Sequence, residues 1–202
     1  MVDKNKEFAI IQAARDRFAH YGYSKVTMEE IATDVELGKA SLYYYFPTKE
    51  DLFKAVISLE QNQLKSNIEL LLSKDESASY KLREYVKLRM KFFRDLINLG
   101  TLSVHSYMDS KSVFKELFVN FEKIELTLIN KIIDEGIEKK EFNNFSDENV
   151  ALVFLHILQG LRCRILKSTR GRELDNKTRD GLQQEMITAT EIFINGIKCK
   201  RF

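Results

Sequence analysis

Residues that interrupt helices are scarce in this chain of 202 residues. It contains one proline, Pro47, and eight glycines, the two residue types that most disfavour a helix interior. Internal repeats and low-complexity segments are also absent from the sequence. Hydrophobic residues make up 44% of the chain, which is enough for a globular core. The composition therefore predicts an all-α protein, built as one large domain or as a small domain followed by a medium one.

Cysteine and long apolar runs are scarce too. The spacing of the two cysteines, Cys163 and Cys199, matches no metal site. They are expected to be reduced thiols in a cytoplasmic protein, with a redox-sensing pair as the alternative. The apolar run at residues 8–14 is too short and weak for a signal peptide. The longest apolar stretch, residues 150–158, contains His156 and is too short to span a bilayer, so no membrane partner is expected.

Motifs of common enzyme classes are missing from the sequence. Its three histidines, His20, His105 and His156, form neither the H-E-x-x-H pattern of zinc proteases nor the E-x-x-H pattern of di-iron bundles. G-x-S-x-G, a phosphate-binding glycine loop and a Cys-His constellation are absent as well. We therefore expect no enzyme, and assign no catalytic residue, metal or cofactor.

A large excess of positive charge is also absent, since the net charge is only +2. Residues 1–57 contain eight Lys and Arg against nine Asp and Glu, a difference of −1. Residues 37–49, in contrast, contain two lysines and no acid. The net charge therefore does not indicate a nucleic-acid binder, but the segment at residues 37–49 could approach a polyanion.

The segment at residues 27–52, TMEEIATDVELGKASLYYYFPTKEDL, has the signals of two short helices and a third one behind the proline. Its start and stop signals are the capping box Thr27-x-x-Glu30, the N-cap Gly38, the stop Pro47 and the N-cap Thr48. Two short helices joined by a turn of about three residues form a helix-turn-helix.

Three consecutive tyrosines, Tyr43, Tyr44 and Tyr45, lie on the middle helix, predicted at residues 39–45. Successive helix positions are about 100° apart, so the three rings cannot all share one buried face. At least two must point outward, where a phenol can donate to a phosphate and its ring can pack on a sugar or a thymine methyl. Lys49, in the first turn of the next helix, opposes the helix dipole unless a phosphate docks there. The alternatives are packing aromatics and a solvated lysine.

These residues resemble the tetracycline-repressor (TetR) family of bacterial one-component transcription regulators over about residues 8–57. The motifs that carry the resemblance are Ala13-Ala14, Phe18 and Gly22-Tyr23, then Thr27, Ile31 and Ala32, then Lys39, Ser41, Leu42 and Tyr43, and finally Tyr45-Phe46-Pro47-Thr48-Lys49-Glu50. In two places the sequence departs from the family pattern. Glu36 replaces a usual turn glycine, which predicts a strained or reshaped turn, and Ala40 replaces a frequent glycine.

The resemblance implies contacts with double-stranded DNA, position by position. Lys39 and Tyr43 are expected at or beside base edges in the major groove. Ala40 is expected where the backbone comes close to DNA, and Ser41 at a base or a phosphate. Further phosphate contacts are expected from Lys25, Thr27, Tyr44 and Lys49.

The remaining sequence predicts a second domain. Residues 1–50 are expected to form a three-helix DNA-binding domain, and residues 51–202 a helical effector-binding and dimerisation domain, with about nine helices in total. The first helix is expected to bury one stripe, formed by Phe8, Ile11, Ala14, Phe18 and Tyr21. Further helices are expected at residues 48–71, 80–97, 103–108, 113–140, 146–167 and 175–198.

The helix predicted from Ser146 is apolar nearly all round, which requires burial on every side. Its spare face is expected to pack, beside the last helix, on a second copy of the chain, and the resemblance implies the same homodimer. The interface residues assigned are Phe154, Leu158, Leu161, Ile165, Met186 and Phe193. A C₂ dimer would place two recognition helices about 34–36 Å apart, or slightly more, on a palindromic operator.

The resemblance also implies a small-molecule effector in the second domain, whose binding releases a repressor from DNA. The residues assigned to the effector are Tyr85, Arg89, Phe92, His105, Tyr107, Phe121, His156 and Arg162. They suit an apolar or amphipathic molecule, with a carboxylate for Arg89 or Arg162. The alternatives are an ordinary core, and a regulator that answers to a protein partner or to no ligand.

Overall fold

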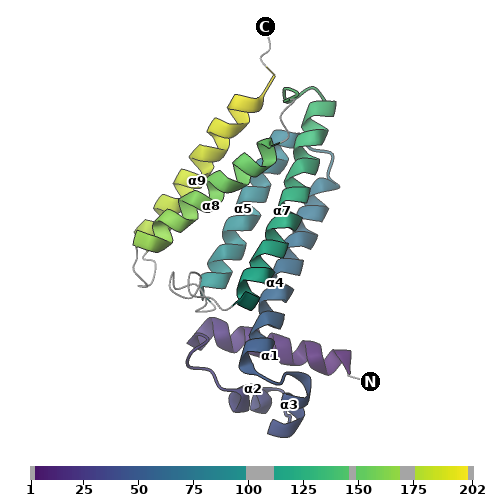
Figure 1. Cartoon of the computed structure of the whole chain (residues 1–202), viewed down its shortest axis with the longest axis vertical. Helices are drawn as coiled ribbons and strands as arrows, with labels where there is room; N and C mark the ends of the chain where they lie inside the picture. Colours follow the sequence, from purple (N-terminus) through teal and green to yellow (C-terminus); the bar gives the residue numbers. More distant parts are fainter. Residues whose placement is uncertain (1–2, 99–111, 146–148, 169–175, 200–202) are drawn as a thin grey trace. The chain divides into compact units, whose positions relative to one another are not determined.

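The computed structural model describes residues 3–98, 112–145, 149–168 and 176–199. Its helices are α1 (Lys4–Tyr21), α2 (Met28–Asp34), α3 (Lys39–Tyr45), α4 (Lys49–Leu72), α5 (Ala78–Asn98), α7 (Ser112–Glu138), α8 (Val150–Ser168) and α9 (Asn176–Ile197) (Figure 1). An antiparallel bridge between Phe142 and Lys198 is isolated, and no strand occurs in these ranges. The predicted all-α class is confirmed. The short helix expected at residues 103–108 lies outside the described residues.

The chain divides into two compact units. The first contains residues 1–63 and 92–114, and the second contains residues 64–91 and 115–202. Helix α4 begins in the first unit and ends in the second. It is continuous, as predicted for residues 48–71. The predicted division into functional domains at residue 50 stays a prediction.

Local capping interactions set the helix starts in the first unit. The Asp3 side chain accepts a hydrogen bond from the Asn5 amide at 3.0 Å and begins α1. The predicted capping box begins α2: the Thr27 amide donates to Glu30 at 2.8 Å, and the Glu30 amide donates to the Thr27 hydroxyl at 3.3 Å. Gly38 is the N-cap of α3. The predicted starts at Thr27 and Gly38 are confirmed.

Helix α2 contacts both α1 and α3, and these helices bury a shared core (Figure 1). The core residues of the first unit are Ile10, Ala14, Phe18, Val26, Met28, Ile31, Ala32, Leu42, Phe46, Leu52, Phe53, Val56, Ile57, Phe92 and Phe93. The predicted stripe of α1 is wrong at its ends, because Phe8 is 53% and Tyr21 54% exposed. Phe8 lies about 200° around the helix from the buried Ile10, which places it on the opposite face.

The turn between α2 and α3 contains the predicted strain. Glu36 has φ 53°, in the left-handed region that L-residues other than Asn and Asp rarely adopt. The turn is closed by hydrogen bonds from the Glu36 amide to the Thr33 carbonyl at 3.1 Å and from the Leu37 amide to the Ala32 carbonyl at 2.9 Å. The family glycine that Glu36 replaces would adopt this backbone without strain.

We expect Glu36→Gly to raise the free energy of unfolding by about 0.5–1 kcal/mol, because relief of the left-handed strain exceeds the added freedom of the unfolded chain. Urea denaturation followed by circular dichroism measures the change. Ala9→Gly, at an exposed position inside α1, is the control and should lower stability by about 0.5–1 kcal/mol. If both variants lose stability equally, the turn is not strained.

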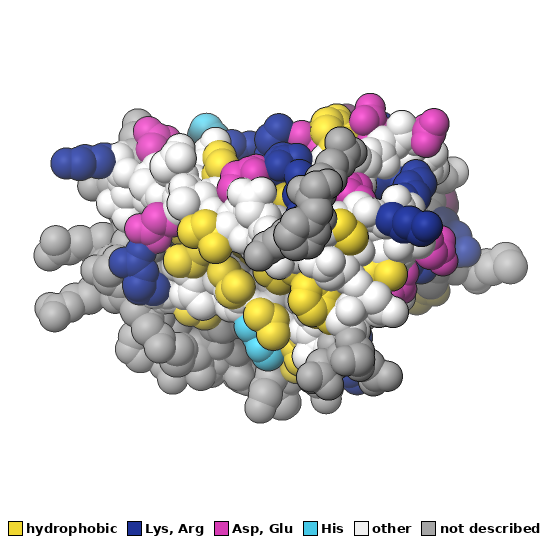
Figure 2. All heavy atoms as spheres, turned by 90° about the horizontal axis from the view of Figure 1, so that it is seen from above, with side chains coloured by type: hydrophobic (Ala, Val, Ile, Leu, Met, Phe, Trp, Pro, Cys, Tyr) yellow, Lys and Arg dark blue, Asp and Glu magenta, His cyan; other side chains and the backbone are white. Residues whose placement is uncertain are grey.

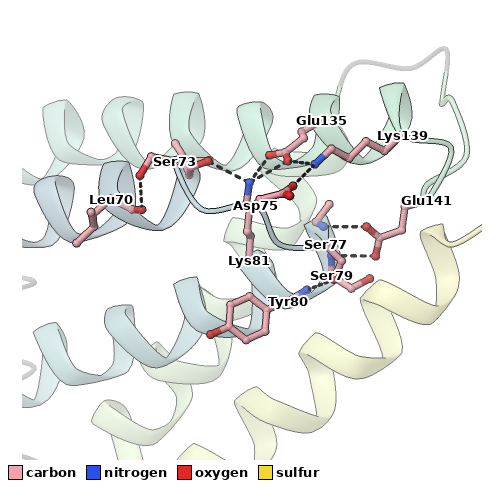
Figure 3. A network of polar contacts seen from close by, with 12 residues as sticks. Leu70, Ser73, Asp75, Ser77, Ser79, Tyr80, Lys81, Glu135, Lys139 and Glu141 are labelled. Atoms are coloured by element: carbon pink, nitrogen blue, oxygen red, sulfur yellow. Dashed lines mark hydrogen bonds and ion pairs between the residues drawn. The ribbon is translucent and has the colours of Figure 1, made fainter.

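In the second unit, a buried lysine joins the end of α4 to α5 and α7 (Figure 3). The Lys81 ammonium, which is 1% exposed, donates to the Leu72 carbonyl at 3.0 Å and to both Glu135 oxygens at 2.8 and 2.7 Å. Lys139 donates to Glu135 as well, at 2.8 Å. Nearby, the Glu141 carboxylate accepts hydrogen bonds from the first two amides of α5 at 2.8 and 3.0 Å. These contacts fix the turn between α4 and α5.

Among the described helices, each is too short or too polar to cross a membrane.

Candidate nucleic-acid interface

Helix α3 separates its aromatic side chains into a buried and an exposed set. Leu42 is 0% and Phe46 6% exposed, so both lie in the core. Tyr43 is 37% and Tyr44 67% exposed, while Tyr45 is half-buried with its ring 5.6 Å from that of Tyr44. At least two tyrosines therefore point outward, which confirms the geometric expectation and leaves two phenols at the surface.

The exposed lysine of α3 already has an acidic neighbour. The Lys39 ammonium forms an ion pair with Glu29 of α2 and lies 5.9 Å from the Tyr43 ring centroid. The hydrogen bond to Glu29 raises the pKa of Lys39, and the hydrogen bond from Lys39 lowers the pKa of Glu29. Lys39 is thus held charged at neutral pH. Ala40 and Ser41, the next two residues of α3, are exposed as well.

Acidic side chains of α2 are neutralised by α1. Arg17 forms an ion pair with Asp34, donating to it at 2.8 Å, and lies 3.6 Å from Glu30. The sequence pattern did not indicate Arg17, because its partners lie on another helix. Lys25 and Thr27, the predicted phosphate contacts ahead of α2, are exposed. Positive and hydrogen-bonding groups therefore remain at the surface while part of the acidic charge is paired.

Lys49 is not a solvated charge. Its half-buried ammonium donates to the carbonyls of Tyr23 at 2.8 Å and Val26 at 2.9 Å, and it lies 4.4 Å from the centroid of the Tyr23 ring. These partners are backbone carbonyls more than twenty positions away, so the pattern of side chains in the sequence does not predict them. The predicted phosphate contact of Lys49 stays a prediction.

A buried ionic cluster lies in the second unit and includes two of the predicted effector residues. Tyr85 (0% exposed) and Arg89 (2%) both donate to one oxygen of Glu125 (2%), each at 2.7 Å. Burial raises the pKa of the Tyr85 phenol well above its usual value, and the Glu125 charge acts in the same direction. Burial lowers the pKa of Arg89, but its charge interactions and hydrogen bonds with Glu125 and Tyr85 together outweigh this effect, and the net pKa is raised. The sequence pattern did not indicate Glu125.

The other predicted effector residues are scattered. Phe121 and Arg162 are buried in the second unit, and Phe92 is buried in the first. His156 is exposed on α8, about 200° around the helix from the buried Phe154. His105 and Tyr107 lie outside the described residues. The effector assignment stays a prediction.

The predicted dimer helices α8 and α9 pack on each other (Figure 1) and leave an apolar surface of their own. Of the assigned residues, Phe154, Leu158 and Met186 are buried within the protomer, Leu161 and Phe193 are half-buried, and the side chain of Ile165 is outside the description. The exposed apolar residues of these helices are Val153 (51%), Ile157 (37%) and Ile192 (69%). Figure 2 shows one face on which hydrophobic side chains gather beside a histidine, with charged side chains around them.

Comparisons with known proteins agree with this description. Residues 10–56 match the family model of bacterial regulatory proteins, tetR family. A solved transcriptional regulator from Cytophaga hutchinsonii ATCC 33406 is 40% identical, with a TM-score of 0.91 over 98% of this chain and 100% of that one. A TetR transcription regulator from Haloarcula marismortui ATCC 43049 shares the fold at 20% identity, with a TM-score of 0.76 over 98% of this chain and 100% of that one.

A curated relative gives the same picture. The HTH-type transcriptional regulator YhgD of Bacillus subtilis (strain 168), described as uncharacterized, is 24% identical over 166 residues, which are 77% of this chain and 81% of that protein. The similarity to the Cytophaga structure spans both units of the chain. It is therefore not confined to the helix-turn-helix.

Proposed function

Since the chain belongs to the TetR family and is a DNA-binding transcriptional regulator, we propose that it is a repressor that binds a palindromic operator as a homodimer and is released by a small effector. Residues 1–50 would form the DNA-binding domain, and residues 51–202 the effector-binding and dimerisation domain. The observation that carries the proposal is the exposure of Tyr43 and Tyr44 on α3 while Leu42 and Phe46 of the same helix are buried.

The exposed side of α3 supports contacts with both bases and phosphates. Lys39 and Tyr43 would reach a base edge in the major groove, which admits an α-helix. Ala40 and Ser41 face solvent at the N-terminal end of the same helix. Phosphate contacts fall to Tyr44 of this helix and to Lys25 and Thr27 ahead of α2, because phenols, ammonium groups and hydroxyls all donate to phosphate oxygens.

Glu29 sets a condition on base recognition by Lys39. To contact a base edge, Lys39 has to leave its ion pair with Glu29. A fully exposed ion pair of this kind is weak, so a good base contact exceeds it. On DNA that lacks this base, no base contact would compensate for the loss of the ion pair between Lys39 and Glu29. Binding to the operator is therefore favoured over binding to other sequences.

Dimerisation through α8 and α9 is supported by the exposure of Val153, Ile157 and Ile192. Val153 and Ile157 are one helical turn apart on α8, so they form a short apolar ridge. An apolar surface rimmed by polar residues is typical of a protein interface. A second copy of the same surface would cover it symmetrically.

The effector would be an apolar or amphipathic molecule bound in the second unit. The buried group of Tyr85, Arg89 and Glu125 is a polar cluster in a largely apolar interior that includes Phe121 and Phe154. A few fixed polar groups in an apolar surrounding are what orient a small ligand. The effector must favour the DNA-free form energetically to release the repressor.

Two substitutions on α3 test the DNA contacts by different signatures. We expect Tyr44→Phe to weaken binding by about 3–10-fold on every DNA sequence, because it removes one hydrogen bond to the backbone. Lys39→Ala should instead reduce the preference for the operator by about 1–3 kcal/mol, because a base contact is lost. Fluorescence anisotropy, with operator DNA found by footprinting the region upstream of the coding sequence, measures both.

Tyr80→Phe, a change of the same chemistry on α5 in the second unit, is the matched control and should leave binding unchanged. Unaltered operator affinity and unaltered sequence preference in both α3 variants would refute the assignment of α3 as the recognition helix.

A further inference from the structure

We propose that Lys49 is a positioning residue for DNA binding. Its ammonium fixes the turn between α1 and α2, and this turn places Lys25 and Thr27 for their phosphate contacts. The inference rests on the proposed function for those contacts. It gives Lys49 an indirect role in place of a contact of its own with phosphate.

The geometry of the ammonium group supports this role. A lysine ammonium has three N–H donors, and two of those of Lys49 are directed at the carbonyls of Tyr23 at 2.8 Å and Val26 at 2.9 Å. The Tyr23 ring lies 4.4 Å from the same nitrogen, within the range of a cation–π contact. Two carbonyls three residues apart can face one nitrogen only if the backbone between them curls around it. Lys49 therefore selects one conformation of the turn.

The turn is held from its other side by aromatic packing. The Tyr23 ring lies 5.6 Å from the ring of Phe18 and 4.7 Å from that of Phe53, and Val26 is 2% exposed. Lys25 and Thr27 flank Val26 directly and are exposed. When the Val26 carbonyl is fixed, the side chains on either side of it project from a fixed backbone.

The same contacts explain why a lysine is tolerated in the first turn of α4. A cation near a helix N-terminus is opposed by the helix dipole. The partial negative charges of two carbonyl oxygens offset this effect within the protein itself. A phosphate is thus not required to make Lys49 favourable, and α4 begins with the residue that secures the start of α2.

Hydrogen exchange on the DNA-free protein tests the positioning without any operator. The Lys25 amide donates to the Gly22 carbonyl at 3.3 Å, and the Thr27 amide donates to Glu30 at 2.8 Å. In Lys49→Met, which keeps the apolar stem but removes the donors, both amides should exchange at least ten times faster (an order-of-magnitude expectation for loss of local protection). Lys54→Met, one turn and a half further along α4, is the matched control and should leave exchange of both unchanged.

Operator binding then separates positioning from direct contact. If Lys49 acts through the turn, Lys49→Met should weaken binding roughly tenfold alone, but only about twofold in a Lys25→Ala background, because coupled residues are not additive. Lys49→Arg keeps charge and donors and should restore both the slow exchange and the binding. It also covers the case in which Lys49→Met fails to fold, because folded Lys49→Arg with slow exchange at both amides but weakened operator binding would count against the role.

The opposite result identifies a phosphate contact. Unchanged exchange at the Lys25 and Thr27 amides, fully additive losses of affinity, and a salt slope that falls by about 0.9 for each lysine removed would overturn the proposal. Failure of the wild-type protein to bind any DNA would instead count against the proposed function, and the exchange measurement would still decide whether Lys49 holds the turn.

Discussion

Glu125→Ala should lower the free energy of unfolding by about 3–5 kcal/mol, the largest effect expected of a single substitution here. The change removes the carboxylate that neutralises the buried guanidinium of Arg89 at 2.7 Å, and it removes the acceptor of the Tyr85 phenol at the same time. Burial makes each loss more costly, since little water reaches these groups. Urea denaturation, followed by circular dichroism, measures the shift.

The matched control is Glu84→Ala on α5, the helix that carries Tyr85 and Arg89. Glu84 pairs with Lys87 at 2.6 Å, but the lysine side chain is 62% exposed. An exposed pair is worth about 0–1 kcal/mol, so this variant should differ little from the wild type. If the two alanine variants are equally stable, the buried cluster has no special weight in the fold.

A double substitution tests whether the fold needs the ion pair itself or only the absence of an unpaired buried charge. Arg89→Met combined with Glu125→Leu removes both buried charges and fills their space with apolar atoms, so most of the lost stability should return. A stable double variant would also remove the charged groups of the proposed effector site. Under the proposed function it would still bind the operator but no longer respond to the effector.

Much of the first unit was predictable because its signals are local. Thr27 and Glu30, three residues apart, satisfy each other's backbone amides, and this fixes the start of α2 whatever else the chain does. Leu42 and Phe46, one turn apart, decide which side of α3 is buried. The strain at Glu36 could be predicted too, because a residue without glycine's freedom stands in a turn that needs it.

Contacts between distant residues were not predictable in the same way. Lys49 meets the carbonyls of Tyr23 and Val26, and a carbonyl is the same in every residue, so no pattern of side chains points to it. Glu125 is one of several acidic residues on α7, and the sequence pattern does not distinguish it from the others. Only the packing of α5 against α7 brings it to Arg89. Tertiary packing brings these partners together, and the sequence pattern does not specify that packing.

The surface of α8 shows where a pattern overreaches. Its nearly continuous apolar composition predicts burial on every side, but composition does not tell which residue belongs to which side. Phe154 and Leu158, assigned to the dimer, lie inside the protomer, whereas Val153 and Ile157 are exposed. A test of dimerisation at Leu158 would therefore unfold the protomer and say nothing of the interface.

Ile157→Arg should convert the proposed dimer to a monomer without unfolding the chain. Because the proposed interface is two-fold symmetric, one substitution places two unpaired charges in the apolar contact, and burial of an unpaired charge costs several kcal/mol. At about 1.4 kcal/mol for each factor of ten, the dimer dissociation constant should rise by at least about a hundredfold. Ile157 is 37% exposed in the protomer, so the protomer itself can accept the change. Sedimentation velocity at micromolar protein should show the mass of one chain.

Ile192→Arg on α9 should have the same effect, because its side chain is 69% exposed on the second helix of the proposed interface. Leu70→Arg, at a 64% exposed position on α4, supplies the control for adding an arginine in place of an exposed apolar residue and should remain dimeric. Both interface variants should also bind the palindromic operator far more weakly than the control, since a monomer engages one half-site at a time. Dimers that persist in both variants, or a wild-type chain that sediments as a monomer, would rule out α8 and α9 as the interface.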